Sequence, residues 1–147
     1  LNYIQKKLID INYHIYGSPK YLEKHGFPKS TSDLNKHSFI SFGRGAPSPV
    51  YNPDWALKLG TKDNKKRKTV MKVNSVYGLL LAVQSGVGLA ALPDYITVNQ
   101  PNIVKVLPNI EGPITEAHFV YPQSMKNVAR VQAFRNFLYS KISEWEF

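Results

Sequence analysis

The residues best suited to chemistry in this chain are polar groups that follow predicted strands or begin a predicted helix. Asn74 and Ser75 precede an apolar run, and either side chain can cap a helix by accepting a hydrogen bond from a backbone N–H. A helix start offers unpaired N–H donors and a partial positive charge, which suit a small anion. Arg44 adds a guanidinium that can hold a carboxylate or a phosphate through two hydrogen bonds. The chemistry indicated is noncovalent binding of a small polar or anionic molecule.

Three points of the predicted fold can converge on such a molecule: the end of a strand over residues 38–42, the helix start, and a glycine turn over residues 86–88. Strand ends and the helix starts that face them form the crevices in which α/β proteins bind ligands. The candidate binding residues at these points are Phe42, Gly43, Arg44, Asn74, Ser75 and Gly88. A purely structural role stays open at each position, because the polar side chains can simply cap, the glycines simply turn and the arginine lie in solvent.

Arrangements of catalytic or metal-binding residues are missing from the sequence. No G-x-S-x-G motif occurs, and Ser18, the nearest approach, is followed by proline and fits a helix cap. The 4 histidines never fall at H-x-x-x-H or H-E-x-x-H spacing, and the chain has no cysteine. The 86–88 turn follows a helix and precedes a strand, which is the reverse of a dinucleotide-binding turn. We therefore predict no enzyme activity, no metal and no cofactor.

The elements that position these residues alternate between strands and helices, which is typical of an α/β fold. Strands are predicted at residues 10–16, 38–42, 55–59, 69–73, 87–92, 103–106 and 117–121, and helices near residues 19–25, 32–36, 76–83, 94–98 and 127–145. The first strand alternates in polarity and should have one face covered. The 76–83 helix is apolar on every side and should be buried, whereas the 127–145 helix should bury one stripe against a sheet.

The charge distribution favours a solvated loop over a nucleic-acid interface. The formal net charge is +9, and residues 62–68 read KDNKKRK, with five basic residues and one acidic residue. This run lies between two predicted strands and is interpreted as the solvated tip of a hairpin. A phosphate-contacting patch is the other interpretation, although no aromatic side chain is interleaved for base stacking. The apolar run at 76–92 is shorter than a membrane span and is interrupted by polar residues, so no membrane partner is predicted.

Several segments resemble, in order, the motifs of one bacterial family. They are YGSPKYL at 16–22, HGFP at 25–28, SDLNKH at 32–37, GVGLAALP at 86–93, VKVLP at 104–108, VYP at 120–122 and VQAFRNFL at 131–138. Together they resemble the effector-binding domain of LysR-type transcriptional regulators, from about residue 8 to the end of the sequence. In that family the second-subdomain wall of the effector cleft resembles the set of candidate binding residues named above.

The resemblance implies a fold like that of type II periplasmic binding proteins, with two α/β subdomains joined by crossing strands. Residues 1–147 would be a partial effector-binding domain, with the second subdomain and the crossing strands at about 10–122. Residues 123–147 would form a helix that returns to the first subdomain. One cleft wall would then be complete, so the chain is not expected to contain two complete subdomains.

The implied function is sensing of a polar or anionic metabolite by a cytoplasmic regulator. DNA would be bound only through a winged helix-turn-helix domain outside this sequence, and the full-length protein would be a homo-oligomer. Two alternatives stay open: a periplasmic-type solute-binding protein, which would need an export signal, and a basic nucleic-acid-binding module.

Overall fold

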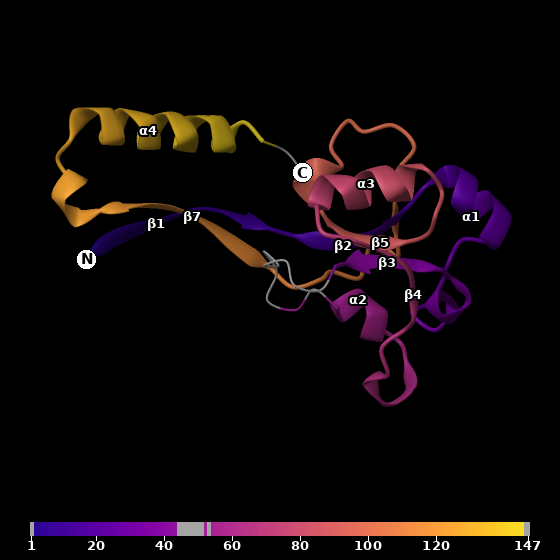
Figure 1. Cartoon of the computed structure of the whole chain (residues 1–147). Coiled ribbons are helices and arrows are strands. Elements are labelled where there is room, and N and C mark those ends of the chain that lie inside the picture. The colour runs from indigo at the N-terminus through magenta and orange to yellow at the C-terminus, as the bar shows by residue number, and fades with distance from the viewer. Residues whose placement is uncertain (1, 44–51, 53, 146–147) are drawn as a thin grey trace. The chain divides into compact units, whose positions relative to one another are not determined.

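A computed structural model describes residues 2–43, 52 and 54–145 of the chain (Figure 1). The chain divides into two compact units. Unit 1 contains Leu1–Ile11 and Thr115–Phe147, and unit 2 contains Asn12–Ile114.

Unit 2 is built on a mixed sheet. Its strands are β2 (Tyr13–Gly17), β3 (Phe39–Phe42), β4 (Thr69–Val73), β5 (Ala90–Pro93) and β6 (Val104–Val106). Strand β2 pairs antiparallel with β5 and β6, and β3 pairs parallel with β4. A parallel bridge between Phe39 and Leu89 joins β3 to the residue that precedes β5. The strands therefore follow the spatial order β4-β3-β5-β2-β6.

A serine cap and a following glycine bound two helices of unit 2, α1 and α3, as the sequence predicts. The helices are α1 (Pro19–His25), α2 (Trp55–Lys58) and α3 (Val76–Gln84), with 3₁₀ helices η1 (Asp33–Lys36), η2 (Lys62–Asn64) and η3 (Asp94–Ile96). Ser18 Oγ accepts a hydrogen bond from Tyr21 N at 3.2 Å at the start of α1. Gly26 and Gly86 follow α1 and α3 with φ of 90° and 80°, a region that glycine enters without a Cβ clash.

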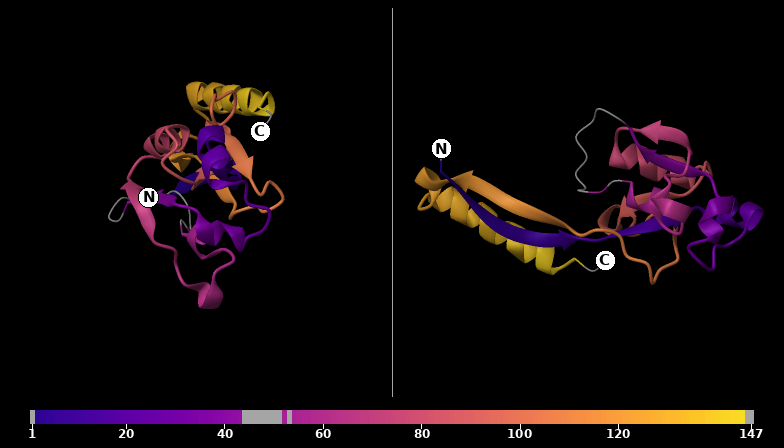
Figure 2. Two further views of the ribbon diagram at one scale, coloured as in Figure 1. Left: turned by 90° about the vertical axis from the view of Figure 1, so that its right-hand side faces the viewer. Right: turned by 90° about the horizontal axis from the view of Figure 1, so that it is seen from below.

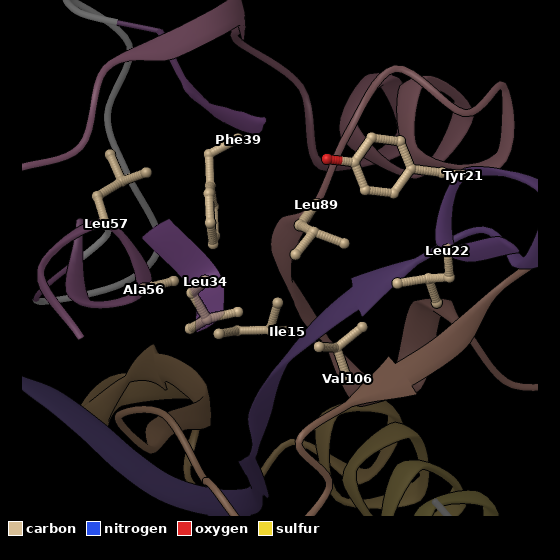
Figure 3. Close-up of a cluster of buried hydrophobic side chains, with 9 residues drawn as sticks. All are labelled: Ile15, Tyr21, Leu22, Leu34, Phe39, Ala56, Leu57, Leu89 and Val106. Carbon is tan, nitrogen blue, oxygen red and sulfur yellow. The ribbon is translucent and has the colours of Figure 1, made fainter. Parts of the chain in front are cut away.

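Helices cover both faces of the sheet, with α3 and α2 on opposite sides (Figure 1). Adjacent strand residues alternate between two apolar clusters, because successive side chains of a strand point to opposite faces. The first cluster, drawn in Figure 3, is Ile15, Tyr21, Leu22, Leu34, Phe39, Ala56, Leu57, Leu89 and Val106. The second, on the α3 side, is Tyr16, Ile40, Leu79, Leu80, Val83, Ala90 and Leu92.

Unit 1 is an antiparallel ribbon with one long helix. Its elements are β1 (Tyr3–Ile11), β7 (Thr115–Pro122), the 3₁₀ helix η4 (Gln123–Met125) and α4 (Ala129–Ser143). The ribbon has a register shift between Lys7 and Ile9, and the right-hand view of Figure 2 shows α4 alongside it. Contacts between them include the Phe119 and Phe134 rings, which meet edge to face at 5.8 Å, and a hydrogen bond from Tyr139 Oη to Lys7 O at 2.9 Å. The described residues of unit 1 thus form one ribbon, one 3₁₀ helix and one α-helix.

Two predictions about residues 55–68 are wrong. Residues 55–58 of the predicted 55–59 strand form the helix α2 instead, in which Leu57 N donates to Asp54 O and Leu59 N donates to Trp55 O. The five residues WALKL, which are apolar apart from Lys58, fit either period, and alanine, leucine and lysine are good helix formers. Without that strand, residues 62–68 are not a hairpin tip. Arg67 is instead half-buried, with its guanidinium 5.5 Å from the centroid of the Phe39 ring.

Three further differences concern burial. The predicted 10–16 strand with one covered face is the end of β1 followed by β2, and all five residues of β2 are buried. Helix α3 is buried on one face rather than all round, since Tyr77 and Leu81 are exposed. Helix α4 contains no fully buried side chain, so its predicted apolar stripe is only partly covered.

Strand β1 itself was not predicted before residue 10, because its register shift interrupts the alternation of polarity.

Candidate functional site

The start of α3 has the geometry that its sequence predicts. Ser75 has extended backbone angles, and its Oγ accepts a hydrogen bond from Gly78 N at 3.3 Å. Its carbonyl oxygen accepts the N–H of Leu79 at 3.0 Å, which closes the first helical turn. Ser75 is therefore the N-cap, and its hydroxyl still has a proton to donate outward. The N–H groups of Val76 and Tyr77 belong to the first turn, which lacks intrahelical acceptors.

The end of β3 lies beside this helix start. In the parallel β3–β4 pair, Phe42 is opposite Val73, and Gly43 N donates to Val73 O at 2.8 Å. A Cβ built on Gly43 would lie 3.6 Å from Asn74 Cβ, so the two residues are neighbours. Parallel strands end at the same edge of a sheet, which brings Gly43 together with Asn74 and Ser75 at the carboxyl edge.

Exposure at this edge differs between the two sides. Asn74 and Ser75 are exposed, whereas Phe42 and Gly43 are half-buried, with Phe42 packed against the α3-side cluster. The edge thus presents an amide, a hydroxyl and the N–H groups of a nine-residue helix next to one aromatic ring. Arg44, the remaining charged candidate, lies outside the described residues.

Gly88 does not join the other candidates. Leu89 N donates to Ser38 O at 2.8 Å, and a Cβ on Gly88 would lie 2.6 Å from that same carbonyl oxygen. Ser38 precedes β3 and Gly43 follows it, so the two residues lie at opposite edges of the sheet. At about 3.3 Å for each strand residue, Gly88 beside Ser38 is about 16 Å from Gly43. The expectation that the glycine turn converges with the other two points is therefore wrong. Gly88 is needed there because backbone approaches backbone too closely for any side chain.

A buried polar cluster was missed by reasoning from the sequence. Asp94 is 5% exposed, and its carboxylate accepts hydrogen bonds from three side chains. The donors are His14 Nδ1 at 2.8 Å, Tyr16 Oη at 2.8 Å and Lys105 Nζ at 3.1 Å. Burial raises the pKa of Tyr16 above its ordinary value. The sequence signal was a pair of polar residues beside apolar segments, His14 within one predicted strand and Asp94 just after another.

Arg67 is the second missed residue, and it is structural. Its Nη1 donates to Ala56 O at 3.0 Å, its Nη2 to Leu59 O at 2.6 Å, and its Nε to Asn35 Oδ1 at 3.0 Å. Burial lowers the pKa of Arg67, although an arginine keeps its charge at any physiological pH. The guanidinium therefore closes the carbonyl end of α2 rather than facing an external anion.

The described part of the chain contains no group of three or more histidine, aspartate or glutamate side chains placed to hold a metal ion. The chemistry that the site geometry supports is recognition through hydrogen bonds and the helix dipole.

The sequence matches the LysR substrate binding domain family over residues 2–142. This chain belongs to that family. The predicted family relationship is thereby confirmed on almost the whole sequence.

Relatives of this LysR-family chain are transcriptional regulators. An uncharacterised HTH-type transcriptional regulator of Haemophilus influenzae is 29% identical over 123 residues, which cover 81% of this chain and 41% of that protein. The HTH-type transcriptional regulator CrgA of Neisseria meningitidis serogroup B is 25% identical over 141 residues, which cover 93% of this chain and 46% of that protein. The chain thus spans less than half the length of these relatives, which are named as regulators and not as enzymes.

Solved structures confirm the fold class. The regulatory domain of CrgA from Neisseria meningitidis has a TM-score of 0.78 at 24% identity, covering 95% of this chain and 69% of that chain. The effector domain of AmpR of Pseudomonas aeruginosa has a TM-score of 0.68 at 17% identity, covering 96% of this chain and 66% of that chain. The α/β, periplasmic-binding-protein-like fold predicted from the sequence is therefore the fold observed. In the described residues, no helix is long and apolar enough to cross a membrane.

Proposed function

We propose that this chain is the effector-sensing part of a LysR-type transcriptional regulator. The observation that carries the proposal is the carboxyl edge of β3 and β4, where Gly43 and Asn74 are neighbours and Ser75 begins α3. Ligands of open α/β sheets bind at such edges. Membership of a family that is named for substrate binding supports the same role.

The ligand that fits this edge is a polar or anionic metabolite, with a carboxylate as the simplest case. Ser75 offers a hydroxyl proton, Asn74 an amide, and the first turn of α3 its free N–H groups and partial positive charge. The half-buried ring of Phe42 offers an apolar contact on the other side. Arg44 follows Gly43 in the sequence and stays a proposed ligand residue, because a guanidinium suits a carboxylate.

In the whole regulator, a winged helix-turn-helix domain outside this sequence would bind DNA, and the protein would act as a homo-oligomer in the cytoplasm. The relatives support this assignment, because they are named as HTH-type transcriptional regulators. They do not favour a periplasmic-type solute-binding protein or a basic nucleic-acid-binding module. The half-buried Arg67 also weakens the second alternative, because it removes one cation from the basic run.

The experiment begins with a thermal-shift screen of small carboxylic acids, each paired with its uncharged amide. The best carboxylate is then titrated calorimetrically into wild-type protein, Ser75→Ala and Ser18→Ala. Ser18 is a matched control, because it caps α1 through the same kind of Oγ contact, to Tyr21 N. Each substitution should lower stability by about 1 kcal/mol through loss of a cap.

Ser75→Ala should weaken carboxylate binding at least tenfold, and Ser18→Ala should change it less than twofold. Equal affinities for Ser75→Ala and wild type would remove Ser75 from the site. Tighter binding of the uncharged amides than of the acids would contradict the anionic ligand.

A further inference from the structure

Asp94 is hydrogen-bonded to the residue at which the chain enters unit 2. The chain enters unit 2 at Asn12 and leaves it at Ile114, and we call residues 12–13 and 112–114, at the two ends of unit 2, the connecting segments. Asp94 N donates to Asn12 O at 2.9 Å, and Gly112 N donates to Tyr13 O at 2.7 Å. The two connecting segments are therefore bonded to η3 and to each other.

Hydrogen bonds to the Asp94 carboxylate connect three strands of the sheet. His14 and Tyr16 are two residues apart on β2, so their side chains share one face. Lys105 of β6 is directly opposite Tyr16 in the antiparallel pair, which puts its ammonium on that face as well. Asp94 follows β5 and receives donors from β2 and β6, so one carboxylate connects all three strands.

The carboxylate suits this place better than any neutral side chain. Three donors converge on its two oxygens, and His14, Tyr16 and Asp94 are all almost fully buried. An asparagine at residue 94 would keep one acceptor oxygen and bring two further N–H donors into the same space. At least one buried donor would then lose its acceptor, and a buried unpaired polar group is strongly unfavourable.

We propose that Asp94 is a positioning residue that holds the two connecting segments against the sheet of unit 2. Local opening of the backbone hydrogen bonds in residues 12–13 and 112–114 then requires the hydrogen bonds of Asp94 to break. These segments would therefore open more easily without Asp94, even where the rest of unit 2 stays folded. In the effector-sensing role proposed above, these segments are the covalent links between the ligand edge and unit 1. That consequence rests on the proposed function, whereas the positioning role of Asp94 does not.

The test is amide hydrogen exchange of the 147-residue chain, followed by NMR, for wild type and Asp94→Asn. Asp54→Asn is the matched control, since Asp54 also pairs with a lysine, Lys66, but near the surface. The amides of residue 94 and Gly112 report on the connecting segments. The amides of Ile40 and Leu89, which bond across the sheet core, report on global opening.

Asp94→Asn should speed exchange at residue 94 and Gly112 at least tenfold more than at Ile40 and Leu89, and Asp54→Asn should change all four less than twofold. A uniform acceleration of the four amides, or an unchanged Gly112, would overturn the proposal. If Asp94→Asn does not fold, the same exchange measurement on Lys105→Met tests the proposal. This variant removes only the half-exposed Lys105 donor and leaves the buried donors to Asp94 in place. It should accelerate residue 94 and Gly112 about threefold, and no selective change would overturn the proposal.

Discussion

The two units of this chain are built from similar elements but bury them differently. Unit 2 has apolar clusters on both faces of its sheet, whereas Tyr121 is the one fully buried hydrophobic side chain among the described residues of unit 1. Large exposed hydrophobic side chains among the described residues of unit 1 are Tyr3, Val120, Met125, Phe134, Phe137, Tyr139 and Trp145. A ribbon and a helix whose sequences have the right alternation of polar and apolar residues therefore do not form a core by themselves. Stability comes mainly from covering an apolar face.

Charged groups show the same contrast. In unit 2, Arg67 and Asp94 are partly or fully buried, and each makes three or more hydrogen bonds. In unit 1, Lys7 pairs with Asp10 and Glu116 while all three side chains are about half exposed. Exposed ion pairs add little to stability, whereas a buried group that loses its partners is costly.

The largest expected effect compares two phenylalanines. Phe39 in unit 2 is 0% exposed and Phe134 in unit 1 is 53% exposed. Phe39→Ala should lower the free energy of unfolding by about 3–5 kcal/mol, because it leaves a cavity in a packed cluster. Phe134→Ala should cost less than about 1 kcal/mol, since most of its ring is already in water. Urea unfolding followed by circular dichroism measures both values.

Comparable losses for the two variants would show that unit 1 has a core as well covered as that of unit 2. Phe137→Ala is the matched control on α4, because Phe137 is 54% exposed and should behave like Phe134→Ala.

Much of unit 2 could be predicted from the sequence because its signals are local. Ser18 and Ser75 as caps, and Gly26 and Gly86 as stops, depend on backbone geometry within a few residues. Helix α2 could not be assigned, since a five-residue run carries too few residues to distinguish the two periods.

The site was predicted only in part, for a related reason. Asn74 and Ser75 are recognisable because a cap is a local feature, and their approach to Gly43 follows from parallel pairing. Gly88 was predicted at the wrong edge of the sheet, because the local sequence of a glycine turn does not indicate the edge at which the turn lies. The partners of Asp94 are 78 to 80 residues away on β2 or 11 residues away on β6, so no local pattern indicates them.

The second prediction sharpens the contrast in charged groups. Arg67→Met should lower the free energy of unfolding by about 2 kcal/mol, because the carbonyl oxygens of Ala56 and Leu59 lose their charged donor. Lys7→Met in unit 1 should change it by less than about 0.5 kcal/mol, as expected for exposed ion pairs. Thermal and urea unfolding of the two variants measure the difference.

Lys65→Ser is the matched control within the basic run, because Lys65 is exposed and should give a change within about 0.5 kcal/mol. A loss as small for Arg67→Met as for Lys65→Ser would contradict the structural role of Arg67 and return it to the solvated part of residues 62–68, whose other members are exposed.

The smallest expected effect is a pH dependence that belongs to unit 2. His37 lies at the end of η1, where its Nδ1 is 3.3 Å from Tyr21 Oη, and that hydroxyl also accepts the N–H of Ser38 at 2.8 Å. A neutral imidazole can accept the hydroxyl proton of Tyr21, whereas an imidazolium would bring a second donor to the same oxygen. Burial lowers the pKa of His37 below its ordinary value, and the nearby His25 lowers it further.

The sign of the effect follows from proton binding. An unfolded histidine titrates near pH 6.5, so below that pH the unfolded chain binds more protons at residue 37 than the folded chain does. The contribution of His37 to stability is complete above about pH 6.5 and declines as the pH falls through its lowered pKa. His37→Gln should flatten this part of the stability profile, measured by urea unfolding at closely spaced pH values from 7.5 to about 5. His118→Gln, which removes the histidine of β7 in unit 1, should leave the decline in place, and a decline that persists in His37→Gln would assign it to another group.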